Sequence, residues 1–171
     1  LTASDGTLLW ETTLDPFGDN DYGSAVAFSG TDILVGGATF NPTQQAYDMV
    51  VARYDVDGNL LWDETIDGIS SLNDAVTALA VSDIGNVFIT GGSETTGSLY
   101  DYRTIKLSPN GAEVWNSTYD YESLYDVPAA IEVDANENVV VTGGSSATFD
   151  NWDFATVKYD AQGNQIAEHR L

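Results

Sequence analysis

The chain has 171 residues, of which 43% are hydrophobic and 11% aromatic, so it can build one packed core and is not compositionally disordered. Its 27 acidic residues against 5 Lys and Arg give a net charge of -22, which argues against nucleic acid or an anionic membrane surface as a partner. Cysteine is absent, which rules out disulfides, thiolate metal sites and cysteine nucleophiles.

A glycine-centred turn recurs along the chain. It is found at Gly6, Gly58, Gly111 and Gly163, which places one repeat every 52 or 53 residues. A Trp follows four residues after each of the first three glycines, and a Thr follows three residues later. The Trp residues are Trp10, Trp62 and Trp115, and the Thr residues are Thr13, Thr65 and Thr118. The last copy has Ala167 and Arg170 instead. Terminal units of repeat proteins are often atypical, and simple sequence drift explains the difference equally well.

Four short strands are predicted in each repeat. The first strand alternates small or polar with larger apolar residues, at 25–28, 78–81 and 130–133. The second is an apolar run ending in two glycines, at 33–37, 87–92 and 139–144, and we expect it in the middle of a sheet. The third spans 48–54, 101–107 and 153–159, and a Gly turn typical of hairpins joins it to the fourth strand, which carries the Trp.

These elements predict an all-β fold built of β-propeller blades. We expect three complete four-stranded antiparallel blades at about 20–67, 73–119 and 125–171, plus one lone N-terminal outer strand at 8–14. A sandwich fits less well, because Greek-key connections give no reason for a fixed sequence period. Propellers usually have four to eight blades. We therefore expect this single domain to belong to a longer chain, or to complete its ring with the lone strand or with another chain.

The segments 52–66, 73–93 and 100–115 resemble the bacterial and archaeal β-propeller repeat family known as SBBP, over nearly the whole chain. The spacing from turn glycine to Trp is similar, more loosely, to the tryptophan-docking turns of quinoprotein propellers. These resemblances imply that the Ala-rich strand is innermost and the Trp strand outermost. They also imply a secreted or cell-surface protein, whereas the quinoprotein chemistry does not carry over to a chain without Cys.

An acid precedes each predicted innermost strand, at Asp21, Asp74 and Asp126. If the repeats surround an axis, these residues are part of a ring, and hard cations such as Ca²⁺ bind clusters of carboxylate oxygens. The simpler interpretation, which we favour, is that each Asp accepts backbone N–H groups in its own turn. Calcium is the one cofactor that the residues leave open.

Two further sets of residues occupy fixed repeat positions. One is the acids Asp48, Asp101 and Asp153 with the bases Arg53, Lys106 and Lys158, for which we expect a structural ion pair or hydrogen bond in each blade. The other is Trp10, Trp62 and Trp115, which we expect to pack between blades while the indole N–H finds a local partner. Both sets are interpreted as scaffold.

The longer links between strands are predicted on one face of the blades and differ between repeats. They carry aromatic residues, which favour recognition of a partner, although capping of the blade ends explains them equally well. The aromatic residues are Phe17, Tyr22, Phe40, Tyr47, Tyr100, Tyr121, Tyr125, Phe149 and Trp152. Asn116 begins an N-x-T sequon on a predicted outer strand and is a candidate glycosylation site.

No catalytic constellation can be assembled around His169, the single His of the chain. We therefore expect a non-enzymatic extracellular or cell-surface structural or interaction module, such as a filament, adhesin or spacer domain. Its expected partners are other protein chains or further copies of itself. The alternative is a carbohydrate-binding or carbohydrate-hydrolysing domain that uses the aromatic loop face. No apolar stretch approaches the roughly 20 residues that span a bilayer, so membrane insertion is not expected.

Overall fold

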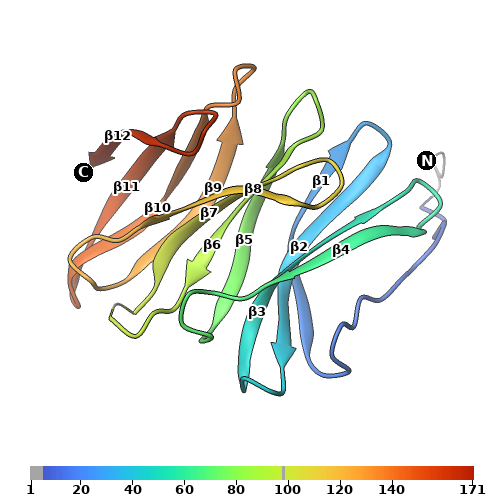
Figure 1. The fold of residues 1–171 in the computed structure, drawn as a ribbon, viewed down its shortest axis with the longest axis horizontal. Helices are drawn as coiled ribbons and strands as arrows, with labels where there is room; N and C mark the ends of the chain where they lie inside the picture. Colours follow the sequence, from blue (N-terminus) through green and yellow to red (C-terminus); the bar gives the residue numbers. More distant parts are fainter. Residues whose placement is uncertain (1–5, 98) are drawn as a thin grey trace.

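The computed structural model describes residues 6–97 and 99–171, and within them it contains strands and no helix (Figure 1). The strands form three four-stranded antiparallel sheets, each in the order of the sequence. The first sheet comprises β1 (Asp21–Ser29), β2 (Asp32–Asn41), β3 (Ala46–Tyr54) and β4 (Leu60–Ile66). The second comprises β5 (Asp74–Val81), β6 (Val87–Ser93), β7 (Asp101–Leu107) and β8 (Glu113–Tyr119). The third comprises β9 (Asp126–Val133), β10 (Val139–Thr148), β11 (Asn151–Tyr159) and β12 (Gln165–Arg170).

The three predicted four-stranded units are therefore confirmed as sheets. Every residue of β6 is buried, as expected for an apolar strand in the middle of a sheet. Every residue of the neighbouring strand β7 is buried as well, although it contains Asp, Arg and Lys. The outer strands β4, β8 and β12 are mostly exposed. Gly58, Gly111 and Gly163 close the turns before these outer strands at φ between 84° and 90°, a conformation that glycine adopts without strain. Among the described residues, no helix has the length and apolarity needed to cross a membrane.

The three sheets lie side by side in chain order (Figure 1), and the apolar core lies between successive sheets. The first junction, between the first and second sheets, is filled by Leu34, Met49 and Val51 against residues such as Ile89 and Ile105. The second junction, between the second and third sheets, is filled in part by Phe88, Tyr102 and Tyr119 against the third sheet. Strand β1 contacts β5, and β5 contacts β9. The described sheets do not close into a ring.

Each Trp of the repeat contacts the turn of the following sheet. The indole Nε1 atoms of Trp10, Trp62 and Trp115 donate to the carbonyl oxygens of Val56, Pro109 and Ala161, at 3.0 to 3.1 Å. Their rings cover Gly58, Gly111 and Gly163, where a Cβ atom would lie 2.7 to 3.1 Å from the nearest ring atom. Glycine is thus needed at these turns for close approach as well as for its positive φ.

The lone N-terminal strand predicted at 8–14 is not present. These residues carry no strand hydrogen bonding, although Trp10 contacts the first sheet in the same way as Trp62 contacts the second. A strand needs a neighbour to which its backbone can bond. The neighbour of Trp62 is β3, and among the described residues the N-terminal segment has no corresponding strand beside it.

Candidate functional site

Three carboxylates meet at each of the two junctions. Asp48, Asp67 and Asp74 lie at the first junction, and each offers an oxygen within 4.8 Å of those of the other two. Asp101, Asp120 and Asp126 form the same arrangement at the second junction. In both groups the first Asp lies at or near the start of a third strand, the second follows a fourth strand, and the third begins the next sheet. The folded repeat therefore produces an acidic triad wherever one sheet meets the next.

In the first triad, the protein forms hydrogen bonds with only one oxygen, Oδ2, of each carboxylate. Asp48 Oδ2 accepts a hydrogen bond from Asn41 at 2.9 Å, and Asp74 Oδ2 accepts one from the backbone N–H of Gly68 at 2.7 Å. Asp67 Oδ2 accepts from Gln44 at 2.7 Å and from Ser71 at 2.9 Å. The Oδ1 atoms of all three Asp residues are buried and lack a hydrogen-bond partner.

The carboxylates of the first triad are costly to ionise. Asp48 and Asp74 are each only 1% exposed. Burial raises the pKa of Asp74 to about 6, and the charge of Asp67 adds to the rise. Burial likewise raises the pKa of Asp48, with a further contribution from Asp67. Three like charges at this distance destabilise one another unless a cation lies among them.

Arg103 is the basic residue beside the first triad. Its Nη1 atom donates to the backbone carbonyl oxygen of Asp67 at 2.7 Å. Burial keeps the pKa of Asp74 raised, and the charge of Arg103 offsets part of that rise. Within the described part of the chain, no salt bridge joins Arg103 to a carboxylate. One guanidinium therefore compensates only part of the negative charge of three carboxylates.

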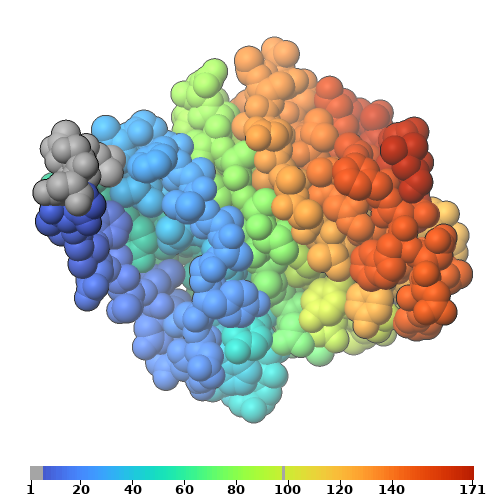
Figure 2. Space-filling view, turned by 180° about the vertical axis from the view of Figure 1, so that it is seen from behind, coloured from blue at the N-terminus to red at the C-terminus, as the bar shows by residue number. Residues whose placement is uncertain are grey.

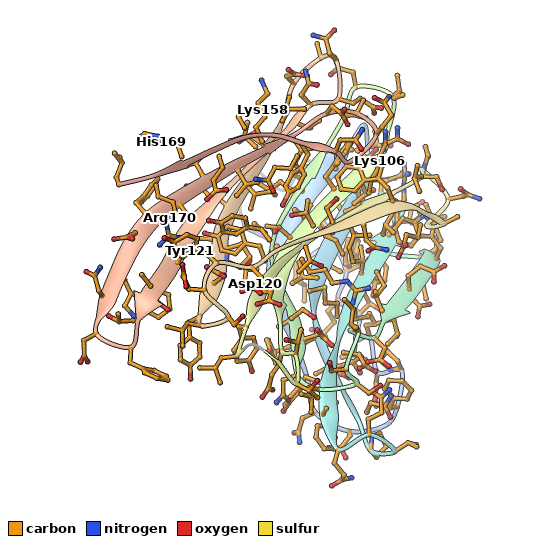
Figure 3. All side chains as sticks on the ribbon, turned by 60° about the vertical axis from the view of Figure 1, so that its left-hand side comes forward. Lys106, Asp120, Tyr121, Lys158, His169 and Arg170 are labelled. Carbon is orange, nitrogen blue, oxygen red and sulfur yellow. The ribbon has the colours of Figure 1, made fainter. Side chains whose placement is uncertain are left out.

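The second triad is more fully satisfied. Asp126 accepts hydrogen bonds at both oxygens, from the Ser145 hydroxyl and from the backbone N–H of Tyr121 at 2.6 Å. Arg170 donates to Ser145 and forms a 2.8 Å salt bridge with Asp153. The Arg170 guanidinium also lies 3.4 Å from the centroid of the Tyr121 ring, and the two labelled side chains are adjacent in Figure 3.

Asp21, Asp74 and Asp126, which were predicted to form a ring, do not lie together in the described part of the chain. Asp21 is exposed, and Asp74 and Asp126 belong to different triads. Both accept backbone N–H groups from the preceding link, from Gly68 and Tyr121 respectively, as the simpler interpretation expected. Two of the other triad members, Asp48 and Asp101, occupy a repeat position that the sequence analysis interprets as scaffold. The remaining two, Asp67 and Asp120, have no role in the sequence analysis.

Two of the repeated basic residues, Arg53 and Lys106, pair with acids outside their own strands. Arg53 forms a 2.8 Å salt bridge with Asp32 on the neighbouring strand. Lys106 forms one with Glu137 in the third sheet, also at 2.8 Å. The pKa of Asp134 is lowered by hydrogen bonds from Asn138, and the charge of Lys158 acts in the same direction. Asp48 and Asp101 belong to the triads, and Asp153 forms a 2.8 Å salt bridge with Arg170.

Several aromatic residues predicted in loops lie on strands instead. Phe40, Tyr47 and Trp152 belong to β2, β3 and β11, because the hairpins β2–β3 and β10–β11 continue pairing almost to their tips. Tyr22 belongs to β1, where it pairs with Ala38 of β2. Phe17, Tyr121, Tyr125 and Phe149 lie in links, and Tyr100 forms only an isolated bridge with Tyr125.

The aromatic residues form two groups. In the first, Tyr47 contacts the rings of Tyr22 and Phe40 edge-on, at centroid distances of 5.5 and 5.3 Å. In the second, Tyr125 stacks with Tyr100 at 6.3 Å and with Trp152 at 6.0 Å. Tyr121 is covered by Arg170 and packs against the second junction. Asn116 is exposed on β8, where its amide donates to Glu113 at 2.6 Å.

The outer faces of the first and third sheets differ from the equivalent faces inside the molecule in how much of their apolar side chains is exposed. Phe154 of β11 is 57% exposed, whereas Met49 and Tyr102, at the same repeat position, are fully buried in the junctions. At the other end, Val26 is 67% exposed, whereas Ile131 at its repeat position is 5% exposed. Each terminal sheet thus leaves uncovered a face that is packed elsewhere in the molecule.

A hollow of about 210 Å³ opens on the uncovered face of the first sheet. It is lined by Leu14 and Pro16 of the N-terminal segment and by Tyr22, Val35 and Gly37 of the sheet. Figure 2 shows the side on which the N-terminal segment, in dark blue, runs beside this sheet. The glycines equivalent to Gly37 are Gly91 and Gly143. A Cβ on Gly91 would lie 2.9 Å from Met49, and a Cβ on Gly143 would lie 2.8 Å from the Tyr102 hydroxyl.

Comparison with known proteins gives a likeness of fold. No family model matches the chain, and no curated protein sequence matches it. A crystal structure described as the eukaryotic initiation factor superposes with a TM-score of 0.57 at 9% identity, covering 95% of this chain and 35% of that one. A protein of unknown function from Bacteroides caccae gives a TM-score of 0.45 at 12% identity, covering 94% and 64%. The chain spans about a third of the initiation factor it matches, and at this identity the likeness concerns the fold alone.

Proposed function

We propose that this chain is a non-enzymatic structural or interaction module, secreted or at the cell surface, that associates end to end through its two uncovered sheet faces. The occupant of each face is a sheet of the same repeat, supplied by a second copy of the chain. Successive copies then extend a filament or complete a propeller ring. The observation that carries the proposal is the exposure of Phe154, 57%, at a position where Met49 and Tyr102 are fully buried.

The shapes of the two faces support this pairing. Within the chain, Met49 and Tyr102 each reach the glycine of the following sheet, Gly91 and Gly143. On the first sheet the equivalent glycine, Gly37, lines the open hollow. Phe154 is the residue that would enter this hollow if a second copy followed the geometry of the internal junctions, with its β12 displacing the N-terminal segment that carries Trp10. Contacts between two different faces are heterologous and propagate or close according to the rotation they impose.

The remaining features agree with a non-catalytic role. His169 is exposed on the edge strand β12 (Figure 3). The acidic surface keeps such a module hydrated, and the excess of Asp and Glu over Lys and Arg disfavours nucleic acid as a partner.

Sedimentation velocity over a range of concentrations tests the proposal. The wild-type chain is expected to form dimers and larger species. Phe154→Asp removes one contact face and Phe28→Asp removes the other, since Phe28 is 59% exposed on β1. Each variant alone is expected to be monomeric, because every contact needs one face of each kind.

A mixture of the two variants makes the test specific. The intact first-sheet face of Phe154→Asp can bind the intact third-sheet face of Phe28→Asp, so the mixture is expected to give a 1:1 dimer and nothing larger. Ile69→Asp, which changes an equally exposed apolar residue in the link between β4 and β5, is the matched control and should associate like wild type. A monomeric wild-type chain at all concentrations, or association of either end variant alone, contradicts the proposal.

Carbohydrate binding is the second candidate, favoured by the stacked rings of Tyr100, Tyr125 and Trp152. Their interplanar angles are 15° and 24°, and Trp152 is 50% exposed, so part of its apolar ring can contact a sugar. Screening on a glycan array, followed by fluorescence titration, tests it. Binding should be lost in Trp152→Ala and kept in Phe149→Ala, a similarly exposed aromatic outside the stack.

A further inference from the structure

Unsatisfied oxygen atoms gather at the first junction. Six buried side-chain polar atoms in the described residues lack a hydrogen-bond partner, and three of them are the Oδ1 atoms of Asp48, Asp67 and Asp74. Two more belong to the cross-strand neighbours of the triad, because Thr39 faces Asp48 and Ser93 faces Asp74. The sixth, the hydroxyl of Tyr159, belongs to the core of the second junction.

Buried polar groups in folded proteins are nearly always satisfied, so such a concentration requires an explanation. Ser93 lies close enough to favour the ionised form of Asp74, but without the geometry of a hydrogen bond. In the second junction the equivalent hydroxyl, of Ser145, does donate to Asp126. The first junction thus keeps oxygens free that the second junction uses.

We infer that Asp48, Asp67 and Asp74 bind a divalent cation, Ca²⁺ by its chemistry, between the first and second sheets. Three carboxylate oxygens within 4.8 Å of one another supply hard, anionic ligands, and the hydroxyl groups of Thr39 and Ser93 lie on the adjacent strands. The second oxygen of each Asp is held by the protein, so the ligands are fixed in place before the ion arrives.

Oxygen-only ligands select against Zn²⁺, Cu²⁺ and other ions that prefer nitrogen or sulfur. A flexible set of carboxylates and hydroxyls also suits Ca²⁺ better than Mg²⁺, which demands near-ideal octahedral geometry. Arg103 does not replace the ion, because its hydrogen bond goes to the backbone of Asp67 and, among the described residues, no salt bridge joins it to the triad. A bound cation would connect Asp48 of β3 and Asp67 of the β4–β5 link to Asp74 of the second sheet.

Calorimetric titration of the full chain with CaCl₂, alongside thermal unfolding, tests this site. Binding is expected with a dissociation constant on the order of 10⁻⁴ to 10⁻³ M, the range of extracellular calcium modules. Calcium at about ten times that constant should raise the melting temperature. MgCl₂ at equal ionic strength should raise it much less, which separates specific binding from screening of the net charge.

The double variant Asp48→Asn and Asp74→Asn distinguishes a ligand role from a purely structural one. Because it removes two buried charges, it should melt without calcium at or above the wild-type temperature, and calcium should no longer raise that temperature. The control is Asp57→Asn with Asp63→Asn, which removes the same charge at exposed positions and should keep the calcium response.

Three results would overturn the inference. They are the absence of calcium binding at millimolar concentration, a calcium response that survives in the Asp48→Asn and Asp74→Asn variant, and an equal loss of response in the exposed control. None of them depends on whether copies associate end to end, because the triad lies inside one chain.

Discussion

The indole N–H of Trp62 donates to the carbonyl oxygen of Pro109, 3.1 Å away and in the next sheet. The same ring covers Gly111, whose added Cβ would lie 3.1 Å from it. Trp10 and Trp115 repeat the relationship with the turns at Gly58 and Gly163. The outer strand of one repeat is thereby fixed to the turn that begins the outer strand of the next, and successive sheets are held in one relative orientation.

Trp62→Ala is expected to lower the free energy of unfolding by about 2 to 3 kcal/mol, from lost apolar burial of a half-buried ring and one hydrogen bond. Trp62→Phe keeps an aromatic ring and loses the N–H, so it should cost about 1 kcal/mol. Urea unfolding measures both values. Leu61→Ala, at a neighbouring exposed position, is the control, and equal losses in Leu61→Ala and Trp62→Ala would show that the docking contact contributes nothing.

Gly163→Ala is expected to be more destabilising than Gly85→Ala by about 1 to 3 kcal/mol. Both glycines have φ near +85°, so both substitutions carry the same backbone strain. Only the Cβ at 163 would collide, at 2.7 Å from Trp115, whereas the nearest atom at 85 is 3.7 Å away. Thermal unfolding of the two variants gives the difference directly, and similar losses would mean that the Trp115 ring moves aside.

Glu137→Ala is expected to cost about 2 to 4 kcal/mol, because it leaves the buried ammonium of Lys106 unpaired. Burial opposes ionisation of Glu137, but hydrogen bonds from Lys106 and Asn86 outweigh it and lower its pKa. Glu137 holds this position despite a φ of +61°. Glu137→Gly should therefore be about 1 kcal/mol less damaging than Glu137→Ala. A fully stable Glu137→Gly variant would argue that the pair between sheets adds nothing.

Acid should weaken the turn at Asp134. The carboxylate accepts hydrogen bonds from the Asn138 side chain and backbone and from the Asn136 backbone, and they lower its pKa below the ordinary 3.8. This stabilisation is complete above the unfolded-state pKa and is lost as the pH falls through the lower folded-state pKa. Asp134→Asn keeps an acceptor without a titrating charge. Its stability deficit relative to wild type, measured by urea unfolding, should shrink below about pH 4, and a constant deficit would contradict this reasoning.

Much of the scaffold could be predicted because it repeats. The spacing of Gly58, Gly111 and Gly163 defined the period, and the apolar runs before Gly92 and Gly144 marked strands that lie inside their sheets. The lengths of the paired strands in the hairpins could not be predicted, because polar residues such as Asn41 can form either strand pairs or loops. In the structure, Asn41 still pairs with Ala46. Periodicity also wrongly suggested a strand at 8–14, because it carries no information on whether a pairing partner exists.

The acidic triads were missed for a different reason. Asp48, Asp67 and Asp74 lie at three repeat positions, and only the packing of one sheet against the next brings them together. A signal was available, since Asp67 and Asp120 both follow the repeated Thr by two residues, as does Asp15. Residues at one repeat position predict a ring of identical side chains, whereas the fold brings residues from three different repeat positions together at one junction.

Nuclear Overhauser contacts between the ring protons of Trp62 and the α-protons of Gly111 test most directly the claim that each repeat is completed by its successor. The two residues lie in different sheets and are far apart in sequence, so only the docked arrangement brings them within range. These cross-peaks are expected, together with the corresponding ones from Trp115 to Gly163. A chain that shows the cross-strand contacts of all three sheets but neither Trp–Gly contact would contradict it.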